Sequence, residues 1–143
     1  MEKIKRHLLQ LEQKQKIYNV LRNELQYNSN VLFAYVHGTF LCNCPFNDID
    51  VAIYVETIPD SVLQYELQME YILMEAIGLY QVDVRILNKA PLVFKYGVIK
   101  NGMLLLSKDE EKRNCFKEET IRDYLDFLPY IKRYRKEVLC VTI

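Results

Sequence analysis

Two aspartates separated by one residue, Asp48 and Asp50, carry the strongest chemical signal in the sequence. They open an apolar run, residues 48–55, whose length and branched side chains predict a buried strand. On a strand the two carboxylates project to the same face, because successive side chains alternate. Paired carboxylates repel each other and are costly to desolvate unless a cation lies between them. Mg²⁺ suits such a pair, since it takes one or two carboxylates and leaves its other positions to water and phosphate.

A Gly-Thr pair lies shortly before the two aspartates. An Asp-x-Asp pattern alone is more often a solvated strand end or a turn than a metal site. Here residues 31–36 form an apolar run typical of a buried strand, and Gly38-Thr39 follows it. A glycine lets backbone N–H groups approach a phosphate, and the threonine hydroxyl adds a donor. Because only the short loop 40–47 separates this turn from Asp48, we predict a phosphate-binding turn beside a metal site.

A third acid, Asp83, interrupts an apolar run at residues 80–87 that predicts another strand. Strand alternation places Val82, Val84 and Ile86 on one face and Asp83, Arg85 and Leu87 on the other. Two interpretations are open. Asp83 pairs with Arg85 at the surface, or it faces Asp48 and Asp50 from a neighbouring strand.

The Gly-Thr turn, the short spacer and the paired acids together resemble a known signature. It is the Gly-Ser, spacer, Asp-x-Asp pattern of the DNA polymerase β-like nucleotidyltransferases. Among these the chain looks most like the minimal nucleotidyltransferases, small single-domain antitoxins paired with HEPN-domain toxins. The likeness covers residues 30–136, with the strand around Asp83 matching the third carboxylate strand of the family. Thr39 stands in place of the usual Ser, and the spacer is shorter and has no basic residue.

The resemblance implies a fold, a cofactor and a partner. The fold class is α/β (α+β), a nucleotidyltransferase fold with a small mixed β-sheet and helices packed against it. Asp48, Asp50 and Asp83 would be catalytic and would hold two Mg²⁺ ions, while Gly38 and Thr39 would bind the phosphates of ATP. AMP would then be transferred from ATP to a tyrosine of a cognate HEPN ribonuclease toxin, which silences it.

Two other functions remain open. The chain is either such an enzyme or a noncatalytic relative that neutralises a partner by binding alone. The shortened, uncharged spacer, the balanced charge and the apolar tail at residues 138–143 all allow the second function. A nucleotidyltransferase that acts on a small molecule or on RNA is the third alternative. It is disfavoured because 143 residues leave little room for a substrate domain, and the charge is balanced.

Composition limits the class of protein further. The 143 residues suffice for one domain with a real core, and 19 basic residues balance 19 acidic ones. Nucleic acid is therefore not expected as a direct partner. The sequence shows no signal-peptide pattern and no apolar run long enough to span a membrane, so we expect a cytoplasmic protein. Cys42, Cys44, Cys115 and Cys140 lack a disulfide-framework spacing and are expected to be free thiols.

The remaining elements follow from periodicity and capping signals. We predict an N-terminal helix at 2–26, a catalytic core at 31–106 and a C-terminal helical region at 109–139. Ser61 with Gln64 predicts a helix start and Gly78 its end. Its expected buried stripe is Val62, Tyr65, Met69, Ile72, Leu73 and Ala76. A short helix at 92–100 and a short strand at 103–106 should follow.

The C-terminal region is charged and helical in pattern. Thr120 with Asp123 predicts a helix cap, and Pro129 should break or kink the helix. The basic residues Lys95, Lys100, Lys132, Arg133, Arg135 and Lys136 are either solvated or in contact with phosphate or a partner.

Overall fold

The computed structural model describes residues 10–42 and 44–138, which form a four-stranded mixed sheet in the order β3-β2-β1-β4. The strands are β1 (Val31–His37), β2 (Asp48–Val55), β3 (Gln81–Ile86) and β4 (Met103–Ser107). β1 runs antiparallel to both β2 and β4, while β2 and β3 are parallel. The predicted class, α/β (α+β) with a small mixed sheet, is confirmed.

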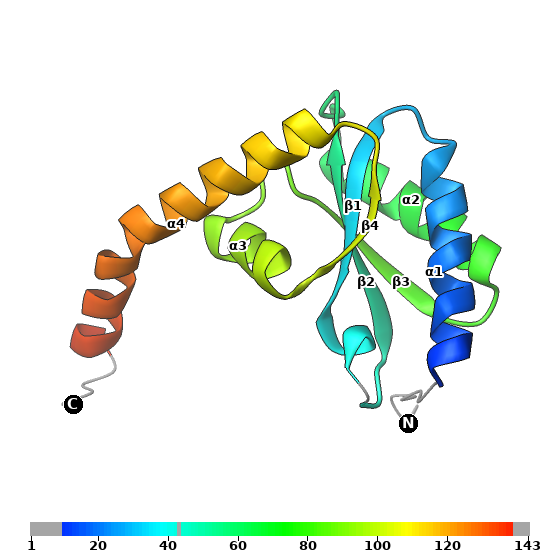
Figure 1. Ribbon diagram of the computed structural model, residues 1–143, viewed down its shortest axis with the longest axis horizontal. Coiled ribbons are helices and arrows are strands. Elements are labelled where there is room, and N and C mark those ends of the chain that lie inside the picture. Colours follow the sequence, from blue (N-terminus) through cyan, green and yellow to red (C-terminus); the bar gives the residue numbers. More distant parts are fainter. Residues whose placement is uncertain (1–9, 43, 139–143) are drawn as a thin grey trace.

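Helices cover both faces of the sheet (Figure 1). α1 (Leu11–Gln26) and α2 (Val62–Ile77) lie on one face, and α3 (Leu92–Asn101) and α4 (Glu110–Val138) lie on the other. A single turn of 3₁₀ helix, η1 (Gly38–Leu41), connects β1 to the loop before β2. The predicted helix at 2–26 is described from Leu11 onward. The first part of that helix and, apart from Val138, the apolar tail at 138–143 lie outside the described residues.

Strand alternation sorts the side chains of β2 and β3 between two cores. Ile49, Val51, Ile53 and Val55 join Val82, Val84 and Ile86 in the larger core beneath α1 and α2. Ala52 lies in the smaller core with Phe33, Leu87 and Phe116 on the opposite face. Asp48, Asp50 and Asp83 follow the alternation of Ala52 and Leu87, so the three acids project from the face that carries α3 and α4.

The helix α2 begins and ends as predicted, but its buried stripe is narrower. The Ser61 hydroxyl accepts the Gln64 N–H at 3.2 Å, and Gly78 ends the helix in a left-handed conformation with φ +87°. Met69 and Leu73 are buried, whereas Val62 and Ile72 are exposed. The prediction for Ile72 fails because it lies one position, about 100° of helix rotation, from Leu73. In α1 the exposed Leu11 and the buried Lys14 likewise reverse the expectation from hydropathy.

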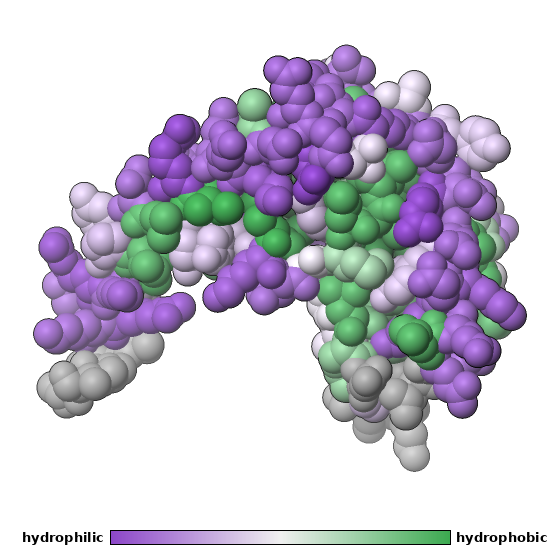
Figure 2. Space-filling model, viewed as in Figure 1, coloured by the Kyte–Doolittle hydropathy of each residue, from purple (hydrophilic) through white to green (hydrophobic). Residues whose placement is uncertain are grey.

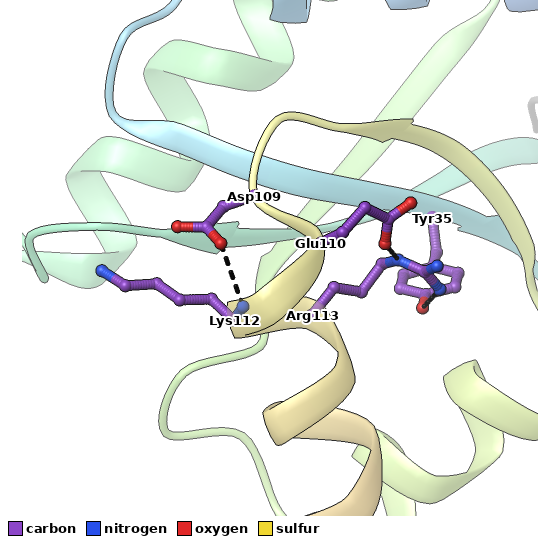
Figure 3. A network of polar contacts seen from close by, with 5 residues as sticks. All are labelled: Tyr35, Asp109, Glu110, Lys112 and Arg113. Atoms are coloured by element: carbon purple, nitrogen blue, oxygen red, sulfur yellow. Dashed lines mark hydrogen bonds and ion pairs between the residues drawn. The ribbon is translucent and has the colours of Figure 1, made fainter.

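The C-terminal region is one helix, not two. α4 begins after Asp109, whose carboxylate accepts the Lys112 N–H at 3.0 Å (Figure 3). The predicted cap at Thr120 is wrong, because this residue is buried inside the helix. Pro129 also lies inside α4 and does not end it. The ribbon of α4 changes direction toward its C-terminal end (Figure 1).

Polar contacts and aromatic packing hold the first turns of α4 against the sheet. Arg113 donates to Glu110 at 2.6 Å and to the Tyr35 hydroxyl at 3.5 Å (Figure 3). Phe116 packs against Phe33 and Tyr54, with ring centroids 5.6 and 5.3 Å away. Farther along, α4 has exposed apolar and aromatic side chains: Ile121, Leu125, Phe127, Tyr130 and Tyr134. Figure 2 shows a hydrophobic band on the side of α4 that faces the hollow beneath it.

The outer edge of β3 is covered by α2. Glu70 accepts the Val84 N–H at 3.0 Å, and Glu66 accepts the Ile86 N–H at 2.8 Å. These two carboxylates satisfy strand amides that have no neighbouring strand on that side. Across the described ranges, no helix has the length and hydropathy that crossing a membrane requires.

Removing the Phe116 ring should weaken the packing of α4 against the sheet. We expect Phe116→Ala to lower the free energy of unfolding by about 3–4 kcal/mol, since a buried aromatic ring is lost. Phe127→Ala, on the same helix but 45% exposed, should cost less than about 1 kcal/mol. Urea unfolding followed by circular dichroism measures both values. Equal destabilisation by the two variants would contradict this anchoring.

Candidate active site

Asp50 lies in the middle of a row of three polar side chains on adjacent strands. The antiparallel pairing of β1 with β2 places His37 opposite Asp50. The parallel pairing of β2 with β3 places Asp83 opposite Asp50 on the other side. The interpretation that Asp83 faces the Asp-x-Asp pair from a neighbouring strand is thus borne out by the strand register.

Asp48 lies two residues before Asp50 on the same strand and opposite Gln81 of β3. It shares the face of Asp50 because side chains alternate along β2. Like Asp50, it is half-buried. The three predicted acids therefore gather at the N-terminal ends of two parallel strands.

An open cleft of about 600 Å³ is lined by all three residues of the row. Its charged and polar lining consists of His37, Asp50, Glu66, Asp83, Arg85 and Lys89. Its apolar lining consists of Ile58, Val62, Ile86, Ala90, Pro91 and Phe94. The cleft has the volume and mixed lining of a small-molecule site. Asp48, Gly38 and Thr39 are not among its lining residues.

The negative charge of the acids in the site is only partly compensated. Burial, and then the charges of Asp83 and Asp48, raise the pKa of Asp50 to about 6, while Arg85 acts in the opposite direction. The Arg85 Nε lies 3.7 Å from an Asp83 oxygen, and both side chains are substantially exposed. Asp83 therefore does both: it pairs with Arg85 at the surface, and it faces Asp50 on the neighbouring strand. Such a pair offsets little of the repulsion between the acids.

The donor set suits a hard divalent cation. Mg²⁺ would relieve both the burial and the neighbouring negative charges that raise the pKa of Asp50. In the part of the chain that the structure describes, no group of three or more His, Cys, Asp or Glu side chains forms a ready-made metal centre. Mg²⁺ often takes only one or two carboxylates and fills the rest of its coordination with water and substrate phosphates.

Gly38 forms the turn directly against Asp50. Its φ of +82° lies in the left-handed region, which L side chains rarely adopt. A Cβ atom at this position would overlap a carboxylate oxygen of Asp50. Thr39 follows as an exposed residue of η1. The Gly-Thr turn and the first acid pair are therefore neighbours in space, as the sequence predicts.

The loop after this turn differs from expectation at its cysteines. The structure brings the Cys42 and Cys44 sulfur atoms into direct contact, which the expectation of separate free thiols did not foresee. Cys115 is free and exposed.

His37 is the residue of the site that sequence reasoning missed. It lines the cleft beside Asp50, and its ring packs edge-on against Phe94 at 5.4 Å. Its Nε2 is buried without a hydrogen-bond partner among the described residues. Burial lowers the pKa of His37, although the charge of Asp83 opposes this. The sequence did offer one signal: His37 directly precedes Gly38, and the last residue of a strand lies beside the turn that follows it.

The basic residues of the cleft were also not predicted. Arg85 and Lys89 line it, whereas Lys95 and Lys100 do not. Arg85 follows the alternation of Asp83 on β3, and Lys89 lies in the turn before α3. Both are exposed and offer positive charge to an anionic ligand.

A family model described as "Polymerase beta, Nucleotidyltransferase" matches residues 15–111. The chain belongs to this family. The matched segment contains the Gly-Thr turn and all three acids. The predicted membership in the DNA polymerase β-like nucleotidyltransferases is thereby confirmed. No curated protein matches the chain significantly.

Solved structures of toxin–antitoxin proteins share this fold. The MntA-HepT toxin–antitoxin matches with a TM-score of 0.66 and 21% identity over 91% of this chain and 99% of that one. A tri-AMPylated HEPN toxin from Shewanella oneidensis in complex with MNT antitoxin matches with a TM-score of 0.67 and 21% identity, over 92% and 99% of the chains. A toxin–antitoxin with AMP-PNP matches with a TM-score of 0.68 and 19% identity, over 85% and 98%.

The contact between Gly38 and Asp50 should make position 38 intolerant of any side chain. We expect Gly38→Ala to lower the free energy of unfolding by about 2–4 kcal/mol, because it adds both backbone strain and overlap with the carboxylate. Gly78→Ala is the matched control, with a φ of +87° and open space around the added Cβ. It should cost about 1 kcal/mol. Equal losses in urea unfolding would contradict a specific contact with Asp50.

The raised pKa of Asp50 should appear as a pH-dependent gain of stability in Asp50→Asn. A carboxyl whose pKa rises from 3.8 to about 6 on folding stabilises the folded state below pH 3.8 and loses that contribution as the pH passes 6. The metal-free Asn variant should exceed the parent protein at pH 7.5 by on the order of 1 kcal/mol, after allowance for solvent screening. The difference should shrink toward pH 4.

Unfolding curves of both proteins in a chelator, across this pH range, measure the effect. Asp126→Asn, which removes an exposed acid of α4, is the control. A stability difference for Asp50→Asn that is constant with pH would contradict the assignment.

Proposed function

We propose that this chain is an antitoxin of the nucleotidyltransferase family that transfers AMP from ATP to a tyrosine hydroxyl of a HEPN-domain ribonuclease toxin. The observation that supports this function best is the pairing of Asp50 with Asp83 across β2 and β3, with Gly38 directly against Asp50. This arrangement joins a carboxylate pair to a turn suited to phosphate. The chain also belongs to the polymerase β nucleotidyltransferase family, which supports transfer of a nucleotide as the reaction.

In the proposed reaction the tyrosine oxygen attacks the α-phosphorus of ATP. The bond from that phosphorus to the bridging oxygen breaks, and pyrophosphate leaves with the electron pair. Asp83 accepts the hydroxyl proton at a carboxylate oxygen and orients the nucleophile. The Gly38 N–H and the Thr39 hydroxyl bind the β- and γ-phosphates, while Arg85 and Lys89 attract the anionic substrate into the cleft.

Asp48, Asp50 and Asp83 would hold the Mg²⁺ ions. When bound, the metal supplies positive charge that stabilises the transferring phosphoryl group and the leaving pyrophosphate. Asp50 suits a shared position because it lies between the other two acids, by sequence spacing on one side and strand pairing on the other. The cleft also excludes part of the solvent around Asp50, which strengthens its electrostatic interactions.

A protein acceptor is supported by the surface of the chain. The exposed apolar and aromatic side chains of α4 lie on the face of the sheet that carries the acids (Figures 1 and 2). Exposed apolar patches of this kind are typical of surfaces that bind another protein. The likeness to toxin–antitoxin complexes, one of them with an AMPylated HEPN toxin, supports the choice of acceptor.

Replacing any one of the three acids should stop AMP transfer without unfolding the chain. We expect Asp48→Asn, Asp50→Asn and Asp83→Asn each to lower the transfer rate by at least about 100-fold, because one charged ligand is lost. The assay uses ATP labelled at the α-phosphate, Mg²⁺ and the protein encoded beside this chain. Glu75→Gln, an exposed acid on α2 and so on the other face of the sheet, is the control and should transfer label at the parent rate.

The same assay distinguishes the rival functions. Tight binding of the partner without label by the parent protein would show neutralisation by contact alone. Transfer by the acid variants at the parent rate would rule out this site. Label on RNA or on a small molecule in place of the partner would overturn the proposed acceptor.

A further inference from the structure

Lys14 is a buried lysine that reaches from α1 into the loop of the candidate site. It is 5% exposed, although its hydropathy places it with the solvated residues of the helix. Its Nζ donates to the Phe40 carbonyl at 2.6 Å and to the Cys42 carbonyl at 2.7 Å. Both carbonyls belong to the turn that begins with Gly38 and Thr39. One side chain therefore connects α1 to two points of the turn.

Aromatic rings complete the surroundings of this ammonium group. The Nζ lies 4.9 Å from the centroid of Phe40 and 5.9 Å from that of Phe46. The two rings pack edge to face at 4.8 Å, and Phe40 also meets Tyr18 at 5.4 Å. Carbonyl oxygens and ring faces thus replace the water that Lys14 loses on burial.

A purely structural role explains this arrangement poorly. A buried charge pays a large desolvation cost, and an apolar residue of similar volume is often as stabilising or more so. Methionine at position 14 would fill the same space between the rings. It would not hold the Phe40 and Cys42 carbonyls in place. What lysine adds is a defined backbone conformation next to Gly38 and Thr39.

We propose that Lys14 is a positioning residue for the nucleotide, which holds the 38–42 turn in the conformation that presents the Gly38 N–H and Thr39 to the phosphates. This role rests on the proposed nucleotidyl transfer. Lys14 acts through the turn, since the hydrogen bonds of its Nζ among the described residues go to the Phe40 and Cys42 carbonyls and not to the three acids. Its loss should therefore weaken nucleotide binding more than it slows the transfer of bound nucleotide.

The experiment compares Lys14→Met with Lys14→Arg, which keeps the charge and the donors, and with Lys16→Met, an exposed control on the same helix. We expect Lys14→Met to raise the KM for ATP at least ~10-fold, with kcat changed less than ~3-fold. Lys14→Arg should restore much of the KM, and Lys16→Met should match the parent protein. Should Lys14→Met fail to fold, Lys14→Gln, which keeps one amide donor, takes its place.

Hydrogen exchange without nucleotide gives a second readout. The Cys42 N–H, which donates to the Thr39 carbonyl at 3.2 Å, should exchange faster in Lys14→Met while amides of β3 keep their rates. An unchanged KM together with unchanged exchange at Cys42 would overturn the role of Lys14 and leave the proposed function standing. Parent protein that neither binds nor transfers nucleotide would overturn the proposed function, and with it this role.

Discussion

The parallel pairing of β2 with β3 forces Asp50 and Asp83 to lie opposite each other on one face of the sheet. Burial of Asp50 makes its charge costly, and the charges of Asp83 and Asp48 add to this, so that the pKa of Asp50 rises to about 6. The surrounding structure accommodates this cost. The exposed Arg85 reduces the repulsion slightly, and glycine at position 38 leaves room for the Asp50 carboxylate. Binding of a cation together with an anionic phosphate would therefore stabilise this charged site most.

The topology explains how three distant segments reach this one point. The chain turns back after β1, and β2 pairs antiparallel with β1, so that His37 and Gly38 lie next to Asp50. The crossover through α2 then brings β3 back parallel to β2, so that the strands begin at the same edge of the sheet. Apolar side chains on the opposite face of β2 and β3 fix this register, because a slip by one residue would turn the acids into the larger core.

Sequence patterns predict the parts of this fold that depend on local chemistry. The strands around Asp50 and Asp83, the Ser61 cap and the left-handed Gly78 all follow from alternation and backbone preference. Predictions fail where tertiary contacts override hydropathy, as at the buried Lys14 and the exposed Ile72. The capping signal at Thr120 fails because its position inside α4 is set by packing on the sheet. His37 escapes notice because its importance depends on the strand pairing, which a linear pattern does not contain.

Glu66 and Glu70 also affect whether another strand can pair with the outer edge of β3. An open row of strand amides is a template for adding a strand from another molecule, which leads to β-augmentation or to aggregation. The two glutamates already accept the Val84 and Ile86 amides. An invading strand would have to displace both carboxylates and leave their charges without donors. Recognition by strand addition is therefore disfavoured at this edge, and the sheet is protected against open-ended stacking with copies of itself.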